Sequence, residues 1–281
     1  MSPPPASDTP VATAPPLTPK LRPVGRRSFA TLRTIIALML REMATTYGRS
    51  PGGYIWAVLE PVGGIALLTL VFSAGFKSPP MGTVFVIFYA TGLIPFLMFL
   101  DVSGKLALSI LFSRQLLAYP GVTYIDALIA RFILNTLTHL MVAYIIFTGI
   151  LLFFDTRTTL ELDRIALGFA MTMALALGVG TMNCFLFSMF PVWQRVWSIL
   201  TRPLFILSCI FFLYESVPDL VRDYLWYLPT VHLTGIMRSA FYVGYDASYV
   251  SPTYVFVVSG VLMVTGLVFL RRYHREVLNN A

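Results

Sequence analysis

Residues 125–154 read IDALIARFILNTLTHLMVAYIIFTGILLFF, and this stretch decides the fold class. An α-helix rises about 1.5 Å per residue, so roughly 20 apolar residues cross the ~30 Å hydrocarbon core of a bilayer. Helices are expected because an open strand would leave backbone amides unpaired in lipid. Comparable apolar runs occur at residues 55–76, 83–103, 165–190, 196–214 and 254–270. The sequence therefore predicts an all-α membrane protein with six transmembrane helices within residues 54–271.

The composition agrees with a chain embedded in a bilayer. Hydrophobic residues make up 57% of the chain and charged residues 12%, with a mean hydropathy of +0.77, whereas soluble domains average about 45–50% and about 25%. The pI near 9.5 does not indicate nucleic-acid binding, because the basic residues lie on short connections between apolar runs, where they set topology and contact anionic lipid. Cys184 and Cys209 each lie inside an apolar run, so we expect reduced, buried thiols.

Charge asymmetry predicts the orientation. If the N-terminus is cytoplasmic, most basic residues lie on the cytoplasmic side and many of the acidic residues lie on the outer side. This distribution agrees with the excess of lysine and arginine that cytoplasmic loops of membrane proteins carry. Both termini are then predicted to be cytoplasmic. The basic residues assigned inside include Arg33, Arg41, Lys105, Arg114, Arg195, Arg202, Arg271 and Arg272, and the acids assigned outside include Asp155, Glu161, Asp163, Glu215, Asp219, Asp223 and Asp246.

The segments before and after the apolar runs differ in character. Residues 1–27 are rich in proline and cannot bury enough apolar surface to fold, so they are predicted to form a disordered cytoplasmic tail. Residues 28–48 are predicted to form an amphipathic helix that lies in the membrane interface, packs on the cytoplasmic ends of the bundle, or does both. Residues 272–281 are predicted to be a second cytoplasmic tail. The expected apolar face of the amphipathic helix comprises Phe29, Leu32, Ile36, Met39 and Met43.

Residues 215–251, between the fifth and sixth apolar runs, are too long for a tight turn. They contain two apolar pieces, at 219–228 and 232–245, and each is too short to span the bilayer. Irregular backbone at membrane depth survives only where protein or a cavity surrounds it. The sequence therefore predicts a re-entrant outer hairpin of two short helices.

Ionisable residues within apolar runs are candidates for function, because their burial is costly. Glu60, Asp101, Asp126 and Arg131 lie toward the cytoplasmic ends of their predicted helices. Three interpretations stay open for them: structural pairing or snorkelling, a role in coupling, and ion transport. His139 is predicted to be a buried histidine hydrogen-bonded across helices, rather than a catalytic one.

Motifs for chemistry are missing from the sequence. It contains no G-x-x-x-x-G-K-[ST] loop for nucleotide phosphates, no H-E-x-x-H or paired-cysteine metal motif, and no G-x-S-x-G nucleophile turn. We therefore expect no catalytic, cofactor-binding or metal-binding residue in this chain.

Three stretches resemble one protein family. They are GYIWAVLEP at residues 53–61, QLLAYPGV at 115–122 followed by DALIAR at 126–131, and LPTVHL at 228–233 continuing to RSAFY at 238–242. In this order, they resemble the ABC type-2 exporter permeases, within which the capsular-polysaccharide and O-antigen export branch is the most similar. The resemblance covers residues from about 28 to 275.

The resemblance implies a permease that pairs as a homodimer in the bacterial cytoplasmic (inner) membrane. Each copy would dock a cytoplasmic ABC ATPase subunit, which binds the ATP and Mg, through the amphipathic helix and a coupling loop at 104–123. The cargo implied is a lipid-linked capsular polysaccharide, passed to a periplasmic co-polymerase and an outer-membrane export channel. Three rivals stay open: the same architecture exporting O-antigen or teichoic acid, an ion-coupled secondary transporter, and a membrane-embedded transferase.

Two sets of candidate site residues follow. The predicted ATPase-coupling residues are Arg33, Arg41, Arg114, Gln115, Leu116, Leu117 and Tyr119. The second set offers aromatic faces and polar edges that suit sugar rings, although an aromatic belt at the lipid interface also accounts for such residues. These predicted substrate-path and gate residues are Tyr54, Trp56, Glu60, Tyr224, Trp226, Tyr227, His232, Arg238, Phe241 and Tyr242.

Overall fold

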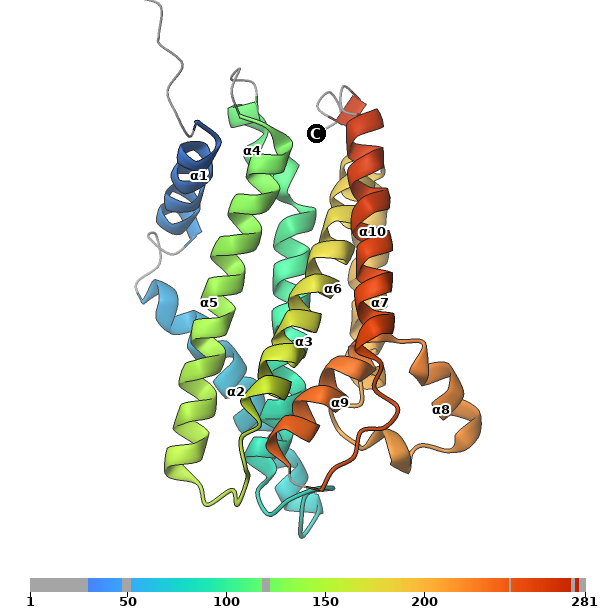
Figure 1. Ribbon diagram of the computed structural model, residues 1–281. Coiled ribbons are helices and arrows are strands. Elements are labelled where there is room, and N and C mark those ends of the chain that lie inside the picture. Colours follow the sequence, from blue (N-terminus) through green and yellow to red (C-terminus); the bar gives the residue numbers. More distant parts are fainter. Residues whose placement is uncertain (1–29, 47–51, 118–121, 243, 274–275, 278–281) are drawn as a thin grey trace, which may run out of the picture.

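The computed structural model describes residues 30–46, 52–117, 122–242, 244–273 and 276–277, and these form helices and connections without strands. The predicted tail at 1–27 lies outside the described residues. Figure 1 shows the helices: α1 (Ala30–Thr46), α2 (Gly53–Gly75), α3 (Phe85–Ala107), α4 (Ser109–Leu117), α5 (Tyr124–Phe153), α6 (Leu162–Met189), α7 (Pro191–Leu207), α8 (Asp219–Trp226), α9 (Pro229–Phe241) and α10 (Pro252–Arg272), with a 3₁₀ turn at Tyr214–Ser216. The all-α prediction is confirmed.

Among the described residues, five helices are long and apolar enough to cross a bilayer: α2, α3, α5, α6 and α10. The predicted fifth run, 196–214, corresponds to α7, which has 17 residues and contains Pro203. The chain leaves α7 at Ser208 and takes a left-handed conformation at Cys209, with φ of 57°. This break divides the apolar run into a short helix and an irregular segment, so the count of six spanning helices is not confirmed.

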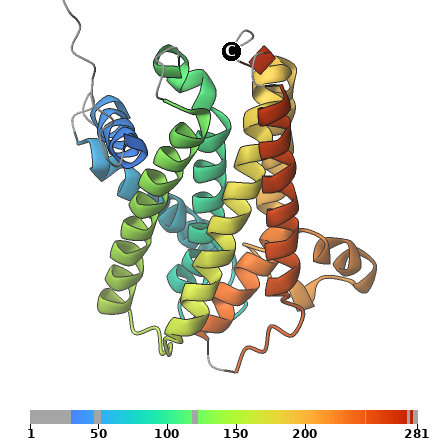
Figure 2. The ribbon, with the colours of Figure 1, turned by 45° about the horizontal axis from the view of Figure 1, so that its top comes forward.

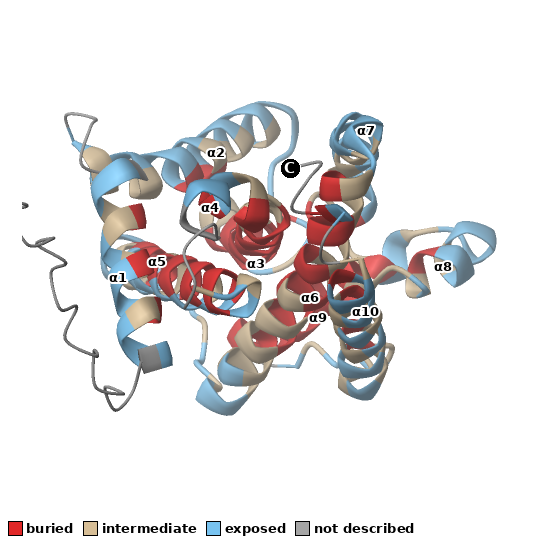
Figure 3. Ribbon diagram, turned by 90° about the horizontal axis from the view of Figure 1, so that it is seen from above, coloured by how far each residue is buried: buried red, intermediate tan, exposed pale blue. Residues whose placement is uncertain are grey.

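Helix α3 lies at the centre of the bundle. Figure 3 shows its buried surface surrounded by α2, α4, α5 and α6, and most of its residues are buried. Helices α6 and α10 run side by side (Figures 1 and 2), and their backbones approach closely at glycines. A Cβ on Gly178 would contact the backbone of Ser259, and one on Gly266 would come within 2.8 Å of the Met182 nitrogen. Small residues therefore permit the backbone contact, as is common between helices in membranes.

Two helices leave most of their surface uncovered. Helix α7 has no buried residue, and α2 buries only Pro61 and Ile65. Apolar side chains such as Leu67 and Ile199 are more than 60% exposed. In a bilayer, such surfaces face lipid or another protein chain.

The predicted outer hairpin forms two short helices, but they differ in their surroundings. Helix α9 has nearly all its residues buried, and it lies against α3 and α6. Helix α8 buries only Leu225 and extends away from the bundle (Figure 1). Both lie at the end opposite α1, α4 and the end of α10. The two helices are confirmed, whereas their re-entry into the membrane stays a prediction.

Candidate functional site

A cavity of about 560 Å³ lies between α2, α3 and α5. On α3, its lining residues run from Ile94 to Lys105, close to the end of the helix that leads into α4. Its walls combine apolar side chains with a few charged groups, which is the usual composition of a small-ligand site. The lining residues are Gly53, Trp56, Ala57, Glu60, Pro61, Ile94, Leu97, Leu100, Asp101, Lys105, Thr138, His139 and Val142.

Three of the charged or titratable lining residues form one cluster. The Asp101 carboxylate lies 2.7 Å from the Lys105 ammonium, one helical turn further along α3. The same carboxylate oxygen lies 2.7 Å from Nε2 of His139 on α5. The predicted hydrogen bond of His139 across helices is therefore confirmed, although the side chain is 21% exposed rather than buried as predicted. Because all three side chains remain partly exposed, their polar edges stay within reach of a ligand.

Helix α2 supplies the opposite wall of the cavity. Trp56 and Glu60 both line it, one turn apart on the same helix face, and the Trp56 ring is 62% exposed. An indole face beside carboxylate, ammonium and imidazole groups is suited to a sugar, whose C–H face stacks on the ring while its hydroxyls hydrogen-bond. Trp56 and Glu60 were predicted path residues, and the structure brings both to this cavity. The third predicted path residue of α2, Tyr54, does not line it.

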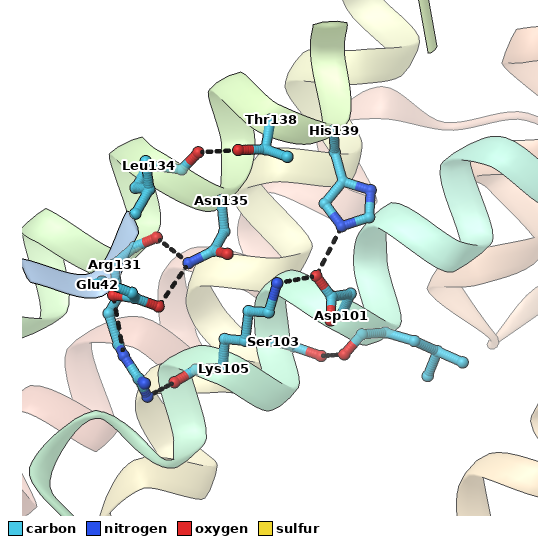
Figure 4. Close-up of polar contacts among 10 residues, drawn as sticks. Glu42, Asp101, Ser103, Lys105, Arg131, Leu134, Asn135, Thr138 and His139 are labelled. Carbon is cyan, nitrogen blue, oxygen red and sulfur yellow. Dashed lines mark hydrogen bonds and ion pairs between the residues drawn. The ribbon is translucent and has the colours of Figure 1, made fainter. Parts of the chain in front are cut away.

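A second polar cluster lies next to the cavity, within the packed interior (Figure 4). Nε of Arg131 on α5 lies 3.2 Å from the Glu42 carboxylate of α1, and the two side chains are 9% and 5% exposed. Asn135 donates to the other Glu42 oxygen at 3.3 Å and to the Arg131 carbonyl at 2.8 Å. Buried charges need such partners, since an unpaired charge in low dielectric is costly.

Arg131 also holds the joint between α3 and α4. Its Nη1 donates to the Lys105 carbonyl at 2.7 Å, in the last turn of α3, where helix carbonyls lack intrahelical partners. The guanidinium lies over the Phe112 ring of α4, 4.1 Å from its centroid. One side chain of α5 therefore contacts α1, α3 and α4.

Glu42 was not among the predicted site residues, and the face of α1 that packs on the bundle differs from the predicted apolar face. That α1 lies in the membrane interface stays a prediction. Ile35, Leu38 and Glu42 are buried, whereas the expected apolar residues Leu32 and Ile36 are 54% and 47% exposed. The signal in the sequence was the position of this lone carboxylate, which follows Ile35 by seven residues and Leu38 by four and so shares a helix face with both. Asp126, by contrast, has a local role. It forms a capping box with Thr123 at the start of α5 rather than an ion pair with Arg131.

A family model for ABC-2 type transporters matches residues 33–242, about three quarters of the chain. The chain belongs to the ABC-2 type transporter family. Among its relatives, the polysialic acid transport protein KpsM of Escherichia coli is 31% identical over 88% of this chain and 96% of KpsM. The capsule polysaccharide export inner-membrane protein CtrC of Neisseria meningitidis is 27% identical over 87% and 92%. BexB of Haemophilus influenzae, of the same description, is 24% identical over 87% and 92%.

The matched region of this ABC-2 transporter contains both the cavity and the Glu42–Arg131 cluster. The family identified from the sequence resemblance is thus confirmed. With five apolar helices of spanning length among its described residues, the chain is a multi-pass membrane protein.

The predicted coupling residues lie at the α1 and α4 end of the transporter. Arg33, Arg114 and Gln115 are exposed, and Arg41 lies over the Phe112 ring, 5.3 Å from its centroid. Leu116 and Leu117 end α4, while Tyr119 lies outside the described residues. Residues 109–117 thus form a helix within the predicted coupling loop at 104–123. Docking of the ATPase stays a prediction.

Arg238, a predicted gate residue, is fully buried and packs against the segment that follows α7. It donates to the carbonyls of Ile210 and Phe212, both at 2.9 Å, and its guanidinium lies 4.3 Å from the centroid of the Phe88 ring. These bonds supply partners for backbone groups that the break after α7 leaves outside a helix. These contacts indicate a structural role for Arg238, which could not be predicted from the sequence because it depends on that break. A gating role for Arg238 stays a prediction.

The remaining predicted gate residues do not form one surface. His232 is fully buried, and its Nδ1 accepts from the Ser251 amide, so its Nε2 donates to the Trp226 carbonyl at 2.8 Å. Phe241 is buried against Phe147. Tyr224 and Tyr227 are exposed on the α8 side, whereas Tyr242 lines a separate cavity of about 340 Å³. A gating role for these residues stays a prediction.

Proposed function

We propose that this chain is the transmembrane permease subunit of an ATP-driven exporter that moves a lipid-linked capsular polysaccharide across the cytoplasmic membrane. The observation that carries the proposal is the cavity between α2, α3 and α5, within the region that matches the ABC-2 family model. Its Trp56 ring and charged groups suit a glycan. Relatives named for polysialic acid transport or capsule export, which align over most of their length, support the choice of cargo.

The assembly that we propose contains two copies of this chain and two ATPase subunits. The uncovered faces of α2 and α7 support pairing of two permeases, because a second copy would cover apolar surface that the single chain leaves exposed. In this assembly, α7 and the irregular segment after it form the sixth membrane crossing, and both termini face the cytoplasm. Exposed Arg33 and Arg114 lie at the end where an ATPase would dock.

The test is restoration of surface capsule in a bacterial strain whose own copy of the gene is deleted. The wild-type chain with its cognate ATPase should restore capsule, while an ATPase with its P-loop lysine replaced should not. The paired substitution Leu116→Asp and Leu117→Asp should abolish export but leave the amount of membrane-inserted permease unchanged. Wild-type export without a functional ATPase would refute the proposal.

Two arms of the same test address the rivals. An ion-coupled secondary transporter finds some support in the Asp101–His139 pair, because carboxylate–histidine pairs can carry protons in membranes. Dissipating the proton gradient while ATP is maintained should leave export intact under our proposal and abolish it under this alternative. Chemical analysis of the accumulated polymer in the deletion strain distinguishes capsular polysaccharide from O-antigen or teichoic acid.

A further inference from the structure

Glu42 connects the first described helix to the wall of the cavity through a short chain of contacts. The first contact is the buried ion pair between Glu42 and Arg131, which joins α1 to α5. Hydrophobic packing of Ile35 and Leu38 of α1 against Ala127 and Ala130 of α5 surrounds this pair. Because both charges are desolvated, displacement of α1 relative to α5 would expose one charge without its partner or move the two together.

The second contact transmits the position of Arg131 to α3. Its Nη1 donates to the Lys105 carbonyl, to which the Ser109 hydroxyl at the start of α4 also donates, at 3.3 Å. The α3 helix ends two residues after Lys105, and α4 begins two residues later. With Phe112 of α4 beneath the guanidinium, Arg131 fixes the angle at the α3–α4 joint.

The third contact reaches the cavity. The Lys105 side chain bonds Asp101, which in turn contacts His139, and all three residues line the cavity. Figure 4 shows both clusters meeting at Lys105, through its carbonyl on one side and its ammonium on the other. A change in the joint that moves the Lys105 backbone therefore alters the polar wall of the cavity.

We infer that Glu42 is a positioning residue that couples α1 to the α3–α4 joint and to the cavity wall. The inference rests on the proposed function, in which α1 and α4 contact the ATPase and the cavity holds the cargo. Coupling of this kind is reciprocal: nucleotide at the ATPase changes the cavity, and an occupied cavity changes the binding of nucleotide by the same factor. Such coupling requires a part of the molecule that changes between two arrangements, and we assign this part to the α3–α4 joint.

The experiment measures how accessible the cavity is to a small reagent, so it requires no known ligand. A cysteine introduced as Leu97→Cys lines the cavity, while the native Cys184 and Cys209 are fully buried and should not react. The complex of permease and cognate ATPase in membrane vesicles is treated with a water-soluble maleimide, without nucleotide and after trapping with ATP and vanadate. In the wild-type background, trapping should change the labelling rate by about fivefold, because labelling follows the population of the accessible arrangement and couplings of this size shift such populations by about that factor.

Two variants test the link, and one serves as a matched control. Glu42→Gln keeps the size of the side chain but removes its charge, and it should abolish the change in labelling on trapping. Arg131→Lys keeps the charge but cannot donate to both Glu42 and the Lys105 carbonyl in the fork geometry of arginine, so it should also abolish the change. Glu161→Gln, the same substitution in a partly exposed ion pair at the opposite end, should leave it intact.

A merely structural role would change protein amount or assembly instead. We therefore expect both test variants to bind the ATPase and to keep its KM for ATP, while losing the link between trapping and cavity labelling. An unchanged response in Glu42→Gln and Arg131→Lys, or no response in the wild-type background, would overturn the inference. Failure of the wild-type chain to bind the ATPase would instead refute the proposed function, and the inference with it.

Discussion

Replacement of Arg238 by methionine should destabilise the fold by an amount that the structure allows us to work out. The side chain is fully buried and donates to two backbone carbonyls in the segment after α7. Hydrogen bonds from a charged donor contribute about 1.5–3 kcal/mol each, so loss of both removes about 3–6 kcal/mol. Relief from burying a cation offsets part of this cost. We expect Arg238→Met to lower the free energy of unfolding by about 2–4 kcal/mol, because the relief from burying a cation offsets the rest of the lost hydrogen-bond energy.

The assay is denaturant unfolding of the detergent-solubilised chain, together with the amount of protein in the membrane. Arg238→Lys should lose about half as much stability, because a compact ammonium keeps the charge but not the planar fork. The matched control is Arg222→Met on α8, where the arginine pairs with Asp219 near the surface, and its effect should stay within about 1 kcal/mol. An Arg238→Met chain as stable as wild type, but defective in export, would refute the structural role and favour the predicted gate.

Three further predictions concern a helix cap, a helix contact and a tyrosine. Thr123→Ala removes the N-cap side chain of the capping box at the start of α5 and should cost about 0.5–2 kcal/mol in denaturant unfolding. Gly178→Leu would force a side chain into the Ser259 backbone and should prevent accumulation in the membrane, whereas Gly149→Leu, which has open space around its Cβ position, should not. Burial raises the pKa of Tyr245 from 10.0 to about 12. Because the folded state disfavours tyrosinate, stability should fall as pH rises from 10 to 12, and the difference in ultraviolet absorbance between the wild-type chain and Tyr245→Phe should place the ionisation of Tyr245 in the folded chain near pH 12 rather than near 10.

Much of the fold could be predicted because lipid imposes strict local rules. Long apolar runs in a bilayer must be helical, so the all-α class follows from the sequence without any knowledge of packing. Chain length and proline also predicted α8 and α9 as two short helices, since neither piece is long enough to span. The prediction of six spans was not confirmed, because hydropathy treats residues 196–214 as one run and does not detect the break after Leu207.

The candidate site was predictable only in part. Trp56 and Glu60 could be identified because an aromatic ring and a carboxylate one turn apart in an apolar helix are conspicuous, and both line the cavity. The hydrogen bond of His139 was expected because a polar ring among apolar residues needs a partner. Its partner Asp101 lies on another helix, and the spacing of residues along one helix cannot specify which side chain of a second helix it faces.

By itself, the sequence determined that this protein is helical, embedded in a membrane and similar to ABC-2 exporters. These properties depend on local composition, helical period and short motifs, each of which is contained in one segment of the chain. The tertiary structure decided that Glu42 pairs with Arg131, that Arg238 supports the segment after α7, and that two polar clusters meet at Lys105. Such contacts depend on the rotation and depth of one helix against another. Those are set by packing of the whole bundle, including glycine contacts such as that of Gly178, and not by any single segment.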